Sequence, residues 1–181
     1  MIIDMIVENG TLKRMTSSSS NIDIPFGVIF IGEKCFMNNK TISCVNIPEG
    51  VLSLEHNSFR DCLLLKNAHL PESLSSIETC AFLNCSSLEE IVIPKKVAKI
   101  GSYSFEGCSM LQSIKIPEGT KAIGSGAFKN CYNLKSVHIS STVFEIASDA
   151  FENCPSLESV VIDKNNPVYT VSDDGVTIIR K

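Results

Sequence analysis

LEEIVIPKKVAKIGSYSFEGCSM, residues 88–110, is one unit of a pattern that returns every 23 residues along most of the chain, and this period indicates the fold. Its phenylalanine is the clearest marker of the period. The same residue type stands at each 23-residue step: Phe36, Phe59, Phe82, Phe105, Phe128 and Phe151. A fixed period of about 20 to 50 residues is the sequence signature of a repeat protein, in which each unit packs on its neighbours.

Other positions of the unit keep the same step. An Ile-Pro or Leu-Pro pair recurs from Ile24-Pro25 to Ile116-Pro117, and Ile139-Ser140 is its degenerate sixth copy. Asn39 stands where the later units have a cysteine, three residues after the phenylalanine: Cys62, Cys85, Cys108, Cys131 and Cys154. The unit therefore reads L-x-x-I-x-I-P-x-x-V-x-x-I-G-x-x-A-F-x-x-C-x-x.

The two halves of the unit predict different local structure. Apolar and polar residues alternate from Leu88 to Ile93, which is typical of a half-buried strand, and Pro94 ends that strand. The segment from Ile100 to Phe105 has small residues between its apolar ends, which favours a turn followed by a short helical or 3-10 segment. We therefore expect a repeat solenoid of the α/β leucine-rich-repeat type, right-handed and of about six rungs. A parallel sheet would form its concave face, with turns and short helical or 3-10 segments on the convex side.

The I-x-I-P, I-G-x-x-A-F and following C elements resemble the BspA-like, Treponema-type leucine-rich repeats. The resemblance covers about residues 20–165 and recurs in six units. It implies a curved solenoid that recognises proteins, often in surface adhesins, and it carries no catalytic residues over to this chain. The first residues, MIIDMIVENG, have no basic segment and are not interpreted as a signal peptide. We therefore expect a cytoplasmic location, with the cell surface or secretion by a route not visible in the chain as the alternative.

Both ends of the repeat array carry hairpin signals. Asn9-Gly10 and Asp174-Gly175 each lie between apolar runs, and such pairs favour tight turns between antiparallel strands. A solenoid end would otherwise expose its core, so we interpret both hairpins as caps. The expected organisation is an N-terminal capping hairpin and connector at 1–19, six repeats at 20–162 and a C-terminal capping hairpin at 163–181.

Composition and charge restrict the kind of partner. The chain has 181 residues and a net charge of −4, so it lacks the basic surface that nucleic acids select. No stretch approaches the ~20 apolar residues that span a bilayer. We expect no nucleic-acid partner and no membrane span, and a protein of unknown identity as the partner.

Residues that could carry chemistry are explained by structure instead. The five cysteines of the column are interpreted as buried, reduced thiols, with disulfides between rungs as the alternative. Cys44 falls at an outward strand position and is the best candidate for a reactive thiol. His69 and His138 share one outward position but lie three rungs, roughly 14 Å, apart, too far for a shared metal. Asp173 and Asp174 lack the spacing of a calcium loop. We expect no catalytic residue, cofactor or metal.

The outward positions of the strands form the candidate binding surface. Two such columns vary along the chain, while the inward columns hardly change. The central members of both columns are the predicted partner-binding residues: Asn67, His69, Glu90, Val92, Ser113, Lys115, Ser136 and His138. The leading hypothesis is a non-enzymatic protein-binding scaffold that uses the solenoid surface. A secreted or cell-surface adhesin is the alternative, and an enzyme is a disfavoured third.

Overall fold

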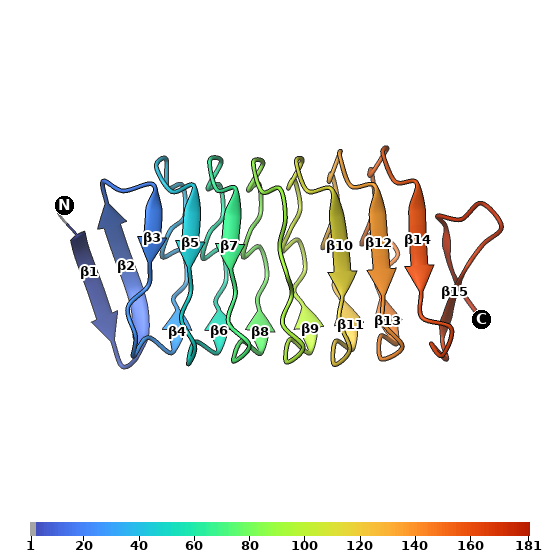
Figure 1. Ribbon diagram of the computed structural model, residues 1–181, viewed down its shortest axis with the longest axis horizontal. Coiled ribbons are helices and arrows are strands. Elements are labelled where there is room, and N and C mark those ends of the chain that lie inside the picture. Colours follow the sequence, from blue (N-terminus) through green and yellow to red (C-terminus); the bar gives the residue numbers. More distant parts are fainter. Residues whose placement is uncertain (1–2) are drawn as a thin grey trace.

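The computed structural model describes residues 3–181 and shows one row of stacked rungs that runs from the N-terminus to the C-terminus (Figure 1). All regular elements among these residues are strands. In chain order they are β1 (Ile3–Glu8), β2 (Thr11–Ser17), β3 (Asn21–Asp23), β4 (Phe30–Ile31), β5 (Cys44–Asn46), β6 (Ser53–Leu54), β7 (Asn67–His69), β8 (Ser76–Ile77), β9 (Lys99–Ile100), β10 (Ser113–Ile116), β11 (Ala122–Ile123), β12 (Ser136–Ile139), β13 (Glu145–Ile146), β14 (Ser159–Ile162), β15 (Tyr169–Val171) and β16 (Ile178–Arg180).

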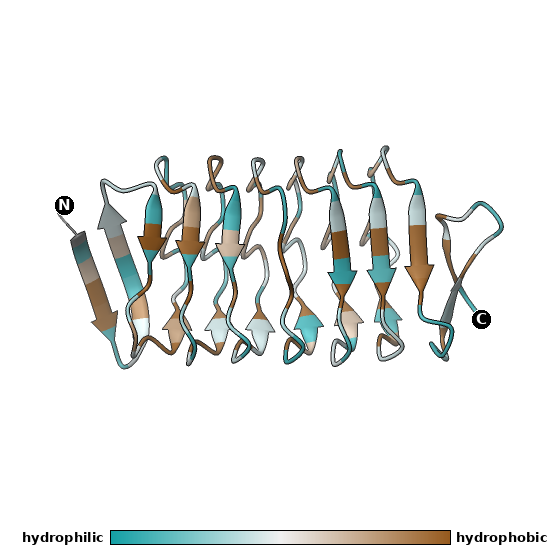
Figure 2. Ribbon diagram, viewed as in Figure 1, coloured by the Kyte–Doolittle hydropathy of each residue, from teal (hydrophilic) through white to brown (hydrophobic). Residues whose placement is uncertain are grey.

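Parallel strands from successive rungs build the first face of the solenoid. β3, β5 and β7 form one three-stranded sheet on this face, and β10, β12 and β14 form a second. The register follows the repeat, because Ser113 pairs with Ser136 and Ser136 with Ser159. Figure 2 shows the expected alternation in β10 and β12, where a hydrophobic residue lies between more hydrophilic ones. The predicted parallel sheet is confirmed. Seven successive strand segments lie along this face, whereas the sequence predicted about six rungs.

A second parallel sheet, which the sequence did not predict, forms another face. Its strands are two residues long and come from the I-G part of each unit, in the order β4-β6-β8-β9-β11-β13. The backbone N–H of Gly101, just after β9, donates to the carbonyl of Ile77 in β8. A side chain on Gly101 would lie 2.5 Å from the backbone of Glu78, so the close approach of these rungs requires glycine.

The predicted helical or 3-10 segments on the convex side are wrong. No helix occurs among residues 3–181, and tight turns stand in that place. In the quoted unit Tyr103 has φ of 56° and Gly107 has φ of 72°, and single left-handed residues interrupt a right-handed helix. The Phe105 amide then donates to the carbonyl of Ala127 in the next rung instead of to its own turn. The sequence signal was the turn-forming residue two after each phenylalanine: Asn38, Asp61, Asn84, Gly107, Asn130 and Asn153.

The core is a set of ladders that run the length of the stack. Neighbouring phenylalanine rings are stacked, with centroids 4.9–5.3 Å apart and ring planes within 3–10°. Burying each such ring contributes roughly 1.5–3 kcal/mol. The thiol of each column cysteine donates to a phenylalanine carbonyl of the preceding unit, as Cys108 does to Phe82. Burial raises the pKa of the Cys62 thiol to about 12.

Antiparallel hairpins lie at both ends of the stack. β1 pairs with β2 around Asn9 and Gly10, whose φ angles are 50° and 76°, and β15 pairs with β16. The carboxylate of Asp174 accepts hydrogen bonds from Ser172 and Thr177 and from two backbone amides, and thereby holds the second turn. The exact boundaries of the three-part division stay a prediction.

Candidate binding face

The eight predicted partner-binding residues lie on the first face, on three strands and on the segment between them. We call the outward side chains of β3, β5, β7, residues 90–93, β10, β12 and β14 the binding face. β7 carries Asn67 and His69, β10 carries Ser113 and Lys115, and β12 carries Ser136 and His138. Parallel pairing places Lys115 directly beside His138. The face therefore brings the predicted residues into one continuous strip, with Glu90 and Val92 between β7 and β10.

The sheet on this face is interrupted at residues 90–93. Only one bridge, between Asn67 and Glu90, connects this segment to β7. Within residues 3–181 no backbone hydrogen bond joins residues 90–93 to β10. We call this gap between residues 90–93 and β10 the seam. Peptide groups on both sides of the seam lack the backbone hydrogen bonds that their equivalents form elsewhere on the face. Buried or half-buried peptide groups require a hydrogen-bond partner.

Two hollows flank the interrupted rung. The first has a volume of about 180 Å³ and lies towards β7, and the second has a volume of about 350 Å³ and lies towards β10. Val92 lines both of them. Six of the eight predicted residues line one or both hollows: Asn67, His69, Glu90, Val92, Ser113 and Lys115. The structure thus gathers these six around Val92, whereas Ser136 and His138 lie on the next strand outside the hollows.

Val92 is the apolar centre of the face. Its side chain is 79% exposed, although the neighbouring Ile91 and Ile93 are buried. Burying an exposed valine contributes up to about 1.5–3 kcal/mol, so a partner that covers it gains from the contact. The sequence showed that valine occupies an outward position there, but the break in the sheet beside it had no local signal.

Charges of both signs surround the second hollow. Glu72 and Glu90 lie with Lys95 and Lys115 along its lining. None of these four side chains forms an ion pair with any residue in 3–181; the nearest ion pair on this part of the chain joins Lys66 to Glu89 at 4.0 Å. The four charges are therefore free to pair with charges of a partner, which gives a mixed polar rim around an apolar centre.

The other candidate side chains do not converge. Across the described part of the chain, no group of three or more His, Cys, Asp or Glu side chains could hold a metal ion. Cys44 lies half-buried on β5, outside both hollows. All eight cysteines are free thiols. Burial raises the pKa of the column thiols, as at Cys108 and Cys131, which lowers their reactivity because the thiolate is the reactive form.

Residues 3–181 contain no helix that is long and apolar enough to cross a bilayer.

Comparison with known proteins identifies the repeat as a BspA-type leucine-rich repeat. The family model described as "BspA type Leucine rich repeat region (6 copies)" matches residues 8–117 and 53–170. A leucine-rich repeat protein of T. pallidum has a similar structure, with a TM-score of 0.83 and 27% identity over 89% of this chain and 80% of that one. A leucine-rich cell surface protein of Faecalibacterium prausnitzii has a TM-score of 0.67 and 28% identity over 81% of this chain and 48% of its own length.

A third solved structure has a similar fold. The pneumococcal vaccine antigen PcpA has a TM-score of 0.80 at 20% identity, over 99% of this chain and 52% of its own. The chain thus spans about half the length of the F. prausnitzii protein and of PcpA. A comparison with curated protein sequences finds no match. Because the family model covers most of the sequence and its columns are the ladders of the structure, the chain belongs to the BspA-type leucine-rich repeat family.

Proposed function

We propose that this protein is a non-enzymatic protein-binding scaffold whose partner docks on the binding face around Val92. The observation that carries the proposal is the pair of hollows on either side of this one highly exposed valine. Membership of a family of repeat scaffolds supports a role in protein binding in general.

The composition of the face describes the partner surface that fits it. Val92 offers a single apolar contact, and aromatic anchors of the kind that concentrate binding energy do not occur among the eight predicted residues. Glu72 and Glu90 favour basic groups on the partner, and Lys95 and Lys115 favour acidic ones. We therefore propose a polar interface of modest affinity, with one small apolar side chain of the partner seated beside Val92.

A charge reversal on the face tests this assignment. The partner is first captured from the native source and identified, and its affinity is then measured by calorimetry. Lys115→Glu is expected to weaken binding by about tenfold or more, because the reversed charge repels the acidic group that Lys115 attracts. Val92→Ser is expected to weaken binding as well, through loss of the apolar contact.

The matched control lies on the other sheet. Lys99→Glu makes the same charge change at an exposed residue of β9, away from both hollows of the binding face. Lys129 is a poorer control because its ammonium group forms a 2.7 Å ion pair with Glu152. Loss of affinity with Lys99→Glu, together with unchanged affinity in Lys115→Glu and Val92→Ser, would move the interface off this face.

A surface adhesin is the second candidate, and one comparison favours it. The F. prausnitzii protein, 28% identical, is described as a cell surface protein. The cytoplasmic location expected from the sequence gains no such support. Labelling intact cells of the native source with a membrane-impermeant amine reagent tests the alternative, since the exposed lysines of a surface protein would react and those of an internal one would stay unlabelled.

A further inference from the structure

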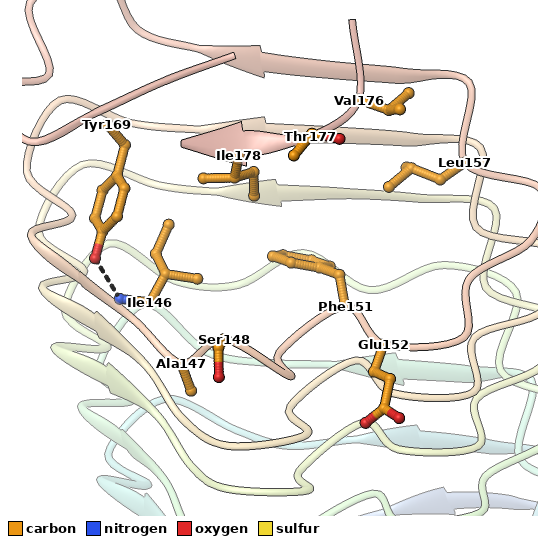
Figure 3. A pocket seen from close by; sticks show the side chains of 10 residues that line it. All are labelled: Ile146, Ala147, Ser148, Phe151, Glu152, Leu157, Tyr169, Val176, Thr177 and Ile178. Carbon is orange, nitrogen blue, oxygen red and sulfur yellow. Dashed lines mark hydrogen bonds between the residues drawn. The ribbon is translucent and has the colours of Figure 1, made fainter. Parts of the chain in front are cut away.

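The C-terminal end of the solenoid contains another cavity, separate from the two hollows of the binding face. It lies between the last repeat and the β15–β16 hairpin and has a volume of about 350 Å³ (Figure 3). The Tyr169 hydroxyl accepts a 3.0 Å hydrogen bond from the Ile146 amide and fixes the hairpin to one side of the rung. Six apolar side chains line the cavity from both sides: Ile146, Ala147, Phe151, Leu157, Val176 and Ile178. The hairpin therefore caps the repeat array without filling the space above its last phenylalanine.

Phe151 is the open end of the phenylalanine ladder. Its ring stacks on Phe128 with centroids 5.2 Å apart and planes within 4°, and its other face lies towards the cavity (Figure 3). The preceding rings from Phe59 to Phe128 each have a stacked ring on both sides. On the side towards the C-terminus, the ring face of each of the five earlier phenylalanines, from Phe36 to Phe128, is thus covered by another aromatic ring.

Two backbone amides at this end, those of Phe151 and Asn153, likewise lack the hydrogen-bond acceptors that the equivalent amides of earlier units have. The amides of Phe105 and Phe128 each donate a 2.8 Å hydrogen bond to a carbonyl of the next rung. The amide of Asn130 likewise donates to the carbonyl of Glu152. Among the backbone carbonyls of residues 3–181, none accepts a hydrogen bond from Phe151 or Asn153. Asn153 is exposed and lies outside the cavity lining, whereas Phe151 is half-buried and lines the cavity. An occupant that carries a peptide carbonyl next to its ring would satisfy the Phe151 donor, whereas a bare hydrocarbon would not.

We propose that this cavity binds one aromatic side chain of a partner polypeptide. The ring lies on the free face of Phe151 and continues the ladder, and a carbonyl of the same segment accepts the Phe151 N–H. The volume is sufficient, because an apolar cavity of about 150 Å³ already holds benzene. This site is distinct from the binding face around Val92 and does not depend on it.

A titration followed by NMR tests the proposal with a minimal ligand. N-acetyl-L-phenylalanine methylamide is added to the full chain labelled with ¹⁵N and ¹³C, and saturable shifts are expected at the amide of Phe151. The cyclohexylalanine analogue has a ring of similar size without aromatic character, and it is expected to bind about three- to tenfold more weakly. Toluene is expected to shift the methyl signals of Ile146 and Ile178 but not the Phe151 amide. Equal affinity of the two amino-acid derivatives, or shifts only outside the cavity, would overturn the proposal.

Two variants locate the site. Phe151→Leu removes the stacking face, and Val176→Trp places an indole in the cavity from the hairpin while the ladder stays intact. Both are expected to abolish saturable binding, and an unchanged amide signal at Phe82 shows that the remainder of the stack is folded. Lys99→Glu, at an exposed residue of β9 outside the cavity lining, is the control and is expected to leave the affinity unchanged. Full binding by both cavity variants would refute the assignment.

Discussion

Replacing Ser104 by alanine is expected to stabilise the protein. The Ser104 side chain is fully buried, and its hydroxyl has no hydrogen-bond partner within residues 3–181. Its column position, just before the phenylalanine, holds alanine in three other units: Ala81, Ala127 and Ala150. The backbone at this position therefore accommodates alanine without rearrangement, and only the hydroxyl distinguishes the two residues.

The magnitude follows from the cost of burying an unsatisfied polar group. That cost is about 1–3 kcal/mol, and removing one oxygen leaves a cavity smaller than a methyl group, which offsets part of the gain. We expect Ser104→Ala to raise the free energy of unfolding by about 1 kcal/mol, or the melting temperature by roughly 2–4 °C for a chain of this size. Urea unfolding followed by circular dichroism measures the change, with thermal unfolding as the check.

The reverse substitution supplies the control. Ala127 is also fully buried, one rung further along, and Ala127→Ser is expected to lower the free energy of unfolding by about 1–3 kcal/mol. Ser58, whose hydroxyl is also buried without a partner, should behave as Ser104 does when changed to alanine. A loss of stability in Ser104→Ala would refute the reasoning, since it would show that the hydroxyl contributes a favourable interaction.

Two other predictions concern the ladder and the C-terminal turn. Phe105→Ala is expected to lower the free energy of unfolding by roughly 3–5 kcal/mol. Phe36→Ala is expected to lower it by less, because Phe36 stacks on only one other ring of the ladder, that of Phe59, whereas Phe105 stacks on two. Equal losses in urea unfolding would argue against the ladder as the core. Hydrogen bonds from Ser172 and Thr177 hold the pKa of the Asp174 carboxyl well below its usual range. The stability that this carboxylate gives to the β15–β16 hairpin is therefore fully present above the unfolded pKa of about 4. It is lost as the pH falls through the lower pKa of the folded state. The protection factors of the hairpin amides, which correct the exchange rates for their intrinsic dependence on pH, should therefore fall on acidification in the wild type and change less in Asp174→Asn. Identical pH profiles of the protection factors would contradict this assignment.

Much of the candidate site follows from the alternation of residues within one unit. Outward and inward positions of β7, β10 and β12 alternate as the repeat predicts, so the predicted residues do lie on one face. The importance of Val92 within that face was not predictable, because its 79% exposure accompanies a missing set of hydrogen bonds to the neighbouring rung. No residue between Glu90 and Ile93 breaks the L-x-x-I-x-I pattern.

The period, the family and the ladders of the core follow from the amino-acid sequence alone. A 23-residue step stacks each residue of one unit on the equivalent residues of the two neighbouring units. The buried neighbours of a residue can therefore be read from the repeat, as with Phe105, whose ring lies between those of Phe82 and Phe128. Three features become visible only in the folded stack: the second sheet, the seam beside β10 and the cavity above Phe151. Each of these depends on hydrogen bonds between different rungs. Such bonds are set by how closely neighbouring rungs approach one another, and apolar periodicity within a rung does not specify that distance.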